Sequence, residues 1–104
     1  MNARIPSPTL HSAEALERIG QVWDAQIVPQ LTEYIRIPAK SPMFAPDWAA
    51  EGLLDTVVRN AAAWVEAQKV TGLTLEIVRL PGRTPVLFFE VAATRTQSTQ
   101  TVLM

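Results

Sequence analysis

Few side chains in this sequence could do chemistry, and they are scattered. His11 is the only histidine, and neither a second imidazole nor a pair of carboxylates lies near it in the sequence. Zinc in proteins is usually held by about four nitrogen, sulfur or oxygen ligands gathered around one point. We therefore interpret His11 as a solvated or helix-capping residue rather than a metal ligand.

Glu51 and Asp55 lie one helical turn apart and could in principle share a cation or a proton. Like charges at this spacing more commonly form a solvated helix face, which is the interpretation we prefer. Ser41 and Ser98 have no basic partner in the sequence that would activate a hydroxyl. The residues present therefore predict no catalytic, cofactor-binding or metal-ligating position.

A proline-bounded loop from Pro38 to Pro46 is the best candidate for a binding surface, because loops carry function more often than helices do. The loop and its flanks carry cations, a methionine and aromatic rings, namely Arg36, Lys40, Met43, Phe44 and Trp48. Such side chains can line a pocket. The structural alternative, which we prefer, is that Phe44 and Trp48 pin the loop against the following helix.

Two helices are expected to come first in the fold. Residues 1–11 carry two prolines and little periodicity, which predicts a mobile arm. Ser12 is a suitable cap for a helix whose apolar stripe recurs every three or four residues from Leu16 to Ile35. Pro29 falls inside this stripe and predicts a kink or break near residues 25–29.

The second helix is expected to start after a cap at Asp47 and to run from Trp48 to a stop at Gly72. Gly52 weakens its first turn, so the helix could start later. The small side chains at 61–63 would let it approach a sheet closely. We expect the three tryptophans, Trp23, Trp48 and Trp64, to be buried in a core.

The pattern changes to a period of two after Gly72, which predicts strands. Residues 73–78 alternate, and residues 80–83 place Pro and Gly at the centre of a type II turn. Residues 85–93 are nearly all apolar, typical of a strand covered on both faces. Residues 101–104 resemble the opening of a third strand. The expected fold is α/β, with two amino-terminal helices and the first strands of a mixed sheet.

Composition excludes several classes of partner. The chain has a formal net charge of -1 with acids and bases interspersed, so it offers no basic surface for nucleic acid or an anionic membrane. It has no cysteine, which excludes disulfides and thiolate metal sites. No segment has the length of a signal peptide or a membrane helix. We expect a cytoplasmic protein.

The order of segments resembles the amino-terminal part of the M20 family of zinc metallopeptidases, and most of all its dipeptidase-like bacterial members. The resemblance covers residues 22–104 and rests on the joint order of segments rather than on any single motif. Those segments are Tyr34-Ile35-Arg36-Ile37-Pro38, Lys40-Ser41-Pro42, Phe44, Asp47-Trp48, Trp64, the run from Arg79 to Val86, and Thr101-Val102-Leu103-Met104.

The resemblance implies that residues 12–104 are an incomplete amino-terminal portion of a catalytic domain that hydrolyses dipeptides or related amides. In that family a strand like 101–104 leads into a Gly-His-x-Asp motif, and two zinc ions are held by residues from that motif onward. All metal ligands would thus lie beyond residue 104, and this chain alone would be inactive. Its expected partner is the remainder of the same domain, and the parent enzyme could form a homo-oligomer.

The alternative is a free-standing α+β binding or interaction module that uses the 38–48 loop for recognition. The length permits a core in principle. Against this alternative, the apolar strand requires cover on both faces, which two helices can hardly supply.

Overall fold

The structure is a computed structural model, and it describes residues 11–95 and 100–104. The chain divides after Arg36 into two units, and each is described by itself. The predicted mobile arm, apart from His11, lies outside the described residues. His11 is the residue immediately before the first helix.

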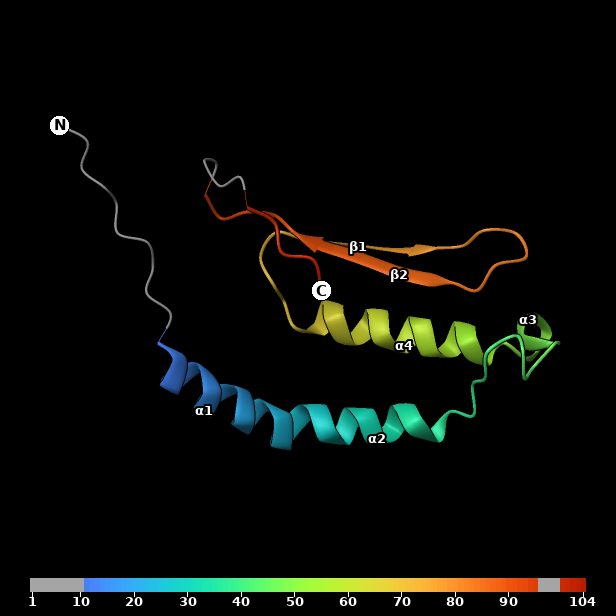
Figure 1. Cartoon of the computed structure of the whole chain (residues 1–104), viewed down its shortest axis with the longest axis horizontal. Helices are drawn as coiled ribbons and strands as arrows, with labels where there is room; N and C mark the ends of the chain where they lie inside the picture. Colours follow the sequence, from blue (N-terminus) through green and yellow to red (C-terminus); the bar gives the residue numbers. More distant parts are fainter. Residues whose placement is uncertain (1–10, 96–99) are drawn as a thin grey trace. The chain divides into compact units, whose positions relative to one another are not determined.

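The first unit contains one continuous helix that has three consecutive parts (Figure 1). These are α1 (Ser12–Val22), the π-helical segment η1 (Trp23–Ile27) and α2 (Val28–Arg36). Ser12 is already the first helical residue and His11 occupies the cap position, with no side-chain hydrogen bond to the helix. The predicted cap is therefore wrong by one residue, and the free N–H groups of the first turn lack a side-chain acceptor.

The predicted disturbance around Pro29 is present as a widened turn rather than a break. The N–H of Val28 donates to the carbonyl of Trp23, five residues earlier, which defines a π turn. Proline has no N–H, and its ring would clash with the carbonyl four residues earlier in a regular α-helix. One extra residue in the preceding turn lets the helix continue through Pro29.

No other described element of the first unit covers the predicted apolar stripe. Its large side chains are exposed, namely Leu16, Ile19, Trp23, Leu31, Tyr34 and Ile35. Within this unit Trp23 therefore does not have the core position predicted for it. A lone helix cannot bury its own apolar face, because burial requires a second surface.

The second unit begins with an irregular loop, as the prolines predict, followed by two helices where one was expected. They are α3 (Trp48–Glu51) and α4 (Leu53–Ala67), separated by Gly52 at φ 70°. This left-handed conformation ends a helix and suits glycine. Asp47 makes no capping hydrogen bond through its side chain, contrary to expectation.

The second helix also ends earlier than predicted. Its last residue is Ala67, and the chain turns at Lys69, which has a φ of 54°, before reaching Gly72. The helix therefore ends four residues before the predicted stop at Gly72 would place its end. Gly72 instead has a φ of 81° at the entry to the first strand.

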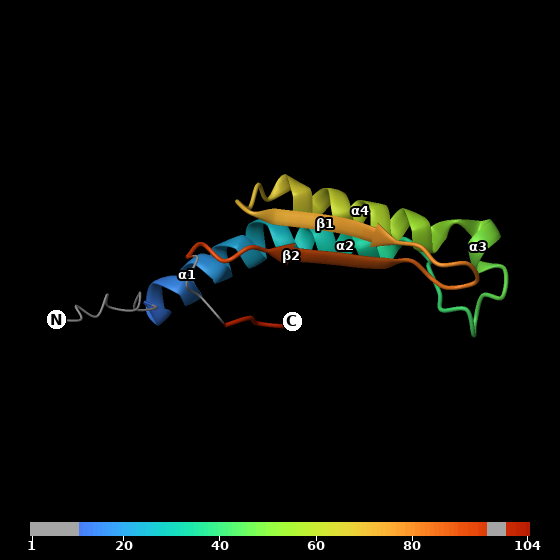
Figure 2. The ribbon, with the colours of Figure 1, turned by 90° about the horizontal axis from the view of Figure 1, so that it is seen from above.

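An antiparallel hairpin completes the second unit, as the alternating pattern predicts. It consists of β1 (Leu73–Val78) and β2 (Val86–Val91), with Leu73 opposite Val91 and Val78 opposite Val86. Between the strands, the N–H of Arg83 donates to the carbonyl of Leu80 at 3.1 Å, which confirms the predicted turn. The hairpin runs alongside α4 in both views (Figures 1 and 2).

Helix α4 covers only part of one face of the hairpin. Val58 and Ala62, one turn apart on α4, are buried, as the small side chains at 61–63 predict for a close approach. Ala45 from the loop is the remaining buried apolar residue among the described residues. Trp48 and Trp64 are only half-buried, so the predicted tryptophan core is not formed in this unit.

The predictions for β2 and for residues 101–104 are wrong within the described part of the chain. Phe88 and Phe89 point to opposite faces of the hairpin, yet they are 52% and 42% exposed, so β2 is not covered on both faces. Residues 101–104 are exposed and form no strand. A strand needs a neighbour for its backbone hydrogen bonds, and the described sheet contains only β1 and β2. Because these two strands are antiparallel, the described part of the chain is α+β and does not show the expected mixed sheet.

Candidate functional site

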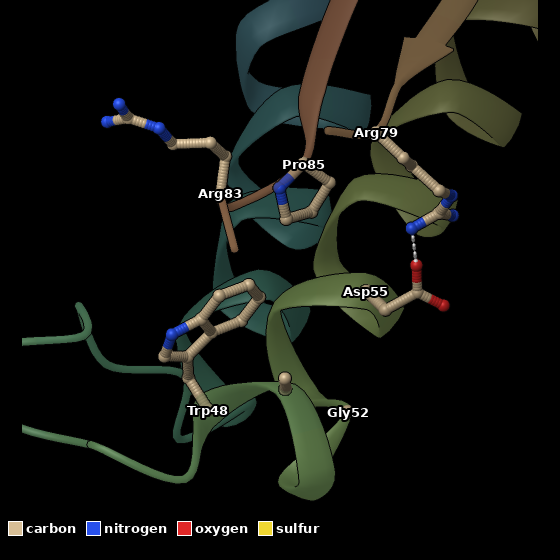
Figure 3. Close-up of a pocket in the computed structure, with 7 residues that line it drawn as sticks. Trp48, Gly52, Asp55, Arg79, Arg83 and Pro85 are labelled. Carbon is tan, nitrogen blue, oxygen red and sulfur yellow. Dashed lines mark ion pairs between the residues drawn. The ribbon is translucent and has the colours of Figure 1, made fainter. Parts of the chain in front are cut away.

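The second unit has a pocket where the start of α4 meets the loop between the two strands (Figure 3). Its volume is about 340 Å³. The lining comes from three places in the sequence: Trp48 and Ala49 on α3, Gly52 and Asp55 at the start of α4, and Arg79, Arg83 and Pro85 after β1. The break at Gly52 separates α3 from α4 at this site.

An ion-pair cluster forms one wall of the pocket. The Asp55 carboxylate pairs with Arg59 one turn later on α4 and with Arg79 just after β1. Figure 3 shows the Arg79 guanidinium directed at the carboxylate. Because Arg79 follows the last residue of β1, this pair joins the helix to the hairpin.

The charge of Asp55 is stabilised by these arginines. Partial burial raises the pKa of Asp55, but hydrogen bonds and charge from Arg79 and Arg59 together outweigh burial and hold the pKa below its ordinary value. The carboxylate is therefore ionised at neutral pH. A group held in this way is poorly suited to donate or accept protons near pH 7.

The opposite side of the pocket is apolar and has a free cation at its rim. The Trp48 ring lies below Pro85, and the Arg83 side chain extends outward, away from Asp55 (Figure 3). No ion pair involves Arg83 within residues 11–95 and 100–104. The pocket therefore combines an aromatic surface with arginine donors.

The structure does not bring together the residues that the sequence offers for catalysis, namely Glu51, Asp55 and Ser41. Glu51 ends α3 whereas Asp55 belongs to α4, so the two carboxylates do not share one helix face. The charge of Asp55 is compensated by arginines instead. Ser41 contributes its backbone carbonyl, which accepts hydrogen bonds from the N–H groups of Phe44 and Ala45 at 2.9 and 3.0 Å. Ser98 lies outside the described residues.

The candidate recognition loop presents its large side chains to solvent. Met43 is 84% exposed and Phe44 is 74% exposed. The preferred interpretation, in which Phe44 pins the loop, is therefore wrong. Ala45 is the buried residue of this loop, and the Ser41 carbonyl accepts the hydrogen bonds that hold the turn.

No group of three or more histidine, cysteine, aspartate or glutamate side chains among the described residues is placed to hold a metal ion. None of the described helices has both the length and the apolar character needed to cross a bilayer.

Sequence reasoning found only part of this site. The spacing of Asp55 and Arg59 is the usual one for a helical ion pair, so that contact could have been predicted. The approach of Arg79 depends on how the hairpin lies on α4, for which the sequence has no local signal. The sequence predicts Trp48 as a core residue and as a residue that pins the 38–46 loop, but not as a wall shared with Arg79 and Pro85.

Comparison with known proteins does not identify the chain. No protein-family model matches it, and no curated protein is significantly similar to it.

Proposed function

We propose that this chain is the amino-terminal frame of a zinc-dependent peptidase or amidohydrolase resembling the M20 family. In this proposal the helices and the hairpin support a catalytic centre that hydrolyses dipeptides or related amides. The two zinc ions are held by side chains of polypeptide outside these 104 residues. The resemblance in segment order from residue 22 onward supports the assignment.

The observation that carries the proposal is the exposure of large apolar side chains on both faces of β2. Phe88 and Val86 lie on one face, and Phe89 and Val91 lie on the other, each more than 40% exposed. Burying one such side chain contributes about 1.5–3 kcal/mol. A strand of this kind is typical of a sheet covered on both sides by further helices or strands.

The small size of the described core supports the same conclusion. Among the described residues the buried apolar side chains are Ala45, Val58 and Ala62, and no large side chain is fully buried. Two alanines and a valine supply little of the apolar burial that must offset the entropy of ordering a chain. Additional polypeptide packed on the hairpin would therefore supply most of the apolar burial that the second unit lacks.

A chimaera tests the proposal directly. The 104 residues are joined to the carboxy-terminal part of an M20-family dipeptidase, starting at its Gly-His-x-Asp motif. We expect the fusion to be soluble, to retain about two zinc ions per chain by elemental analysis, and to hydrolyse a dipeptide. The 104-residue chain alone should retain substoichiometric zinc after desalting and show no hydrolysis.

The matched control is the same fusion carrying Phe88→Lys, which places a charge on the hairpin face that the proposal buries. It should lose zinc or solubility, whereas Gln21→Lys, an equal charge change on α1, should not. Tight stoichiometric zinc on the chain alone would contradict the proposal. An inactive, zinc-free fusion together with a cooperatively folded monomer of the chain alone would also contradict it.

A second function, a binding module that uses the 38–48 loop, is favoured by the exposure of Met43 and Phe44. Adjacent exposed apolar side chains on an ordered loop are common in recognition surfaces. This function requires the chain to be a stable monomer, so sedimentation and thermal unfolding of the chain alone separate the two proposals. A Met43→Ser, Phe44→Ser variant should lose partner binding only under the second.

A further inference from the structure

The pocket beside Asp55 has an excess of positive charge. Asp55 is the only acidic side chain in its lining, whereas Arg79 and Arg83 line it and Arg59 pairs with Asp55 from outside. Three guanidinium groups and one carboxylate leave two positive charges without an acidic partner in this cluster. Excess charge of this kind favours an anionic ligand.

Arg79 is held in a fixed orientation and still has free donors. A guanidinium has five N–H donors, and the ion pair with Asp55 uses one of its terminal nitrogens. Within the described residues no other acidic side chain pairs with Arg79. Because Asp55 is itself held by Arg59, the Arg79 side chain is preorganised for a second acceptor.

The opposite wall of the pocket suits an apolar body. Trp48 is half-buried and Pro85 lies next to its ring (Figure 3). Arg83 lines the pocket from the loop between the strands, and its side chain is exposed and extends outward in Figure 3. An exposed arginine side chain can change rotamer, which makes its guanidinium available to a ligand at the rim. A volume of about 340 Å³ is at the lower end of the range for small-molecule sites.

We propose that this pocket binds a small organic carboxylate with a planar apolar body. The body lies between Trp48 and Pro85, and the carboxylate accepts hydrogen bonds from Arg79 and Arg83. Asp55 does not contact the ligand but positions Arg79. This inference uses only residues of the second unit and does not depend on the proposed zinc chemistry.

Benzoate is a suitable probe, and benzamide is its neutral counterpart of the same shape. Both are titrated into the 15N-labelled 104-residue chain, and the Trp48 indole N–H and the arginine Nε–H signals are followed by NMR. We expect benzoate to shift these signals saturably, with benzamide at least about fivefold weaker because it lacks the charge. Inorganic phosphate should compete poorly, since it has no apolar body.

Arg83→Gln should weaken benzoate binding by about threefold or more, the usual scale for an exposed ion pair. Arg18→Gln, the same charge change on α1, should leave binding unchanged. Both arginines are exposed and neither forms an ion pair within the described residues, so neither change should unfold the chain. Equal responses to benzoate and benzamide would overturn the proposal. Equal effects of the two variants, stronger binding of phosphate than of benzoate, or no shift of the Trp48 signal would also overturn it.

Discussion

Asp55 is the residue at which two distant parts of the second unit meet. Its carboxylate pairs with Arg59 on the same helix and with Arg79 after β1. The side chain is 25% exposed, so the ion pairs are partly desolvated and less screened than those on an open surface. The cluster therefore specifies where the hairpin lies along α4, in addition to any contribution to stability.

The depressed pKa of Asp55 predicts a loss of stability in acid. Because the pKa is lower in the folded state, the carboxylate contributes stability that is fully present above the unfolded value of about 3.9. That contribution is lost as the pH falls through the lower folded pKa. A carboxyl 13C NMR titration should place the Asp55 midpoint below that of a free aspartate.

Asp55→Asn should remove this acid dependence and increase amide hydrogen exchange at the junction of α4 and β1. Asp47→Asn is the control, since Asp47 is exposed and forms no ion pair within the described residues. An Asp55 midpoint at or above the ordinary value, or equal exchange in the two variants, would contradict the importance of the cluster.

Two glycines provide a matched test of backbone conformation. Gly52 has a φ of 70° and Gly20 lies within α1, and a Cβ atom added at either position meets no atom within 4 Å. Gly52→Ala should therefore destabilise α4 by about 1–2 kcal/mol, the cost of a left-handed conformation. Gly20→Ala should stabilise α1 by about 0.5–1 kcal/mol.

Amide hydrogen exchange in the adjoining helix measures both effects, because it reports the local opening free energy of each unit separately. Exchange should become faster in α4 for the first variant and slower in α1 for the second. If both glycine substitutions changed the exchange rate in the same direction, backbone conformation at Gly52 would not determine the break between α3 and α4.

At the scale of elements, the π turn decides which side chains of the first helix share a face. Each inserted residue rotates the following part of a helix by about 100°, the angle per residue. The stripe before Trp23 and the stripe after Ile27 are therefore offset relative to a regular α-helix. If residues 16–35 were treated as one regular α-helix, the apolar side chains after the π turn would be assigned to the wrong face.

Pro29→Ala should convert the π turn into regular α-helix. The substitution restores the N–H at position 29 and removes the ring that clashes in a regular helix. Proline in a helix interior costs up to about 3 kcal/mol relative to alanine, and the gain here should be smaller because the π turn already relieves the clash. Carbon secondary chemical shifts and N–H to C=O couplings across residues 23–29 measure the change.

The contrary result would be an unchanged coupling between the Val28 N–H and the Trp23 carbonyl. That outcome would show that Pro29 is not the cause of the π turn. Gln30→Ala is the control, since it changes a neighbouring exposed residue without restoring a backbone donor.

The sequence predicted elements well where the signal is local. The hairpin follows from alternation in residues 73–78 and from the Pro81-Gly82 turn, both of which are local features. The break at Gly52 was anticipated only as a weakened turn, because a glycine in a helical pattern is compatible with either outcome. Ser12 and Asp47 were predicted as caps because of their residue types, but neither side chain makes the hydrogen bond.

The candidate site was less predictable because it is built from tertiary contacts. Arg79 and Trp48 are 31 positions apart and line the same pocket only because the hairpin lies on α4. For Phe44, in contrast, the sequence predicts a contact that the structure does not contain, because this aromatic side chain in a proline-rich loop is exposed. Loop side chains have no periodicity from which their direction could be derived.

At the scale of the whole molecule, the exposed apolar surface is the dominant property of each unit. In the second unit the hairpin exposes apolar side chains on both faces, and β2 has a free edge within the described sheet. Surfaces and edges of this kind pair with other polypeptide. The chain alone is therefore expected to self-associate at concentrations where a well-covered domain would remain monomeric.

Phe88→Lys should weaken this self-association by about tenfold, since burial of a phenylalanine contributes about 1.5–3 kcal/mol. Phe88 is 52% exposed and lies on the hairpin face opposite to Phe89, so the substitution removes little folded-state packing. Sedimentation velocity over a concentration series measures the effect, with Gln21→Lys as the charge-matched control on α1. If both variants self-associate as strongly as the unmodified chain, the hairpin face carrying Phe88 is not the surface of association. The proposal that this chain is the frame of a larger domain then loses its main structural support.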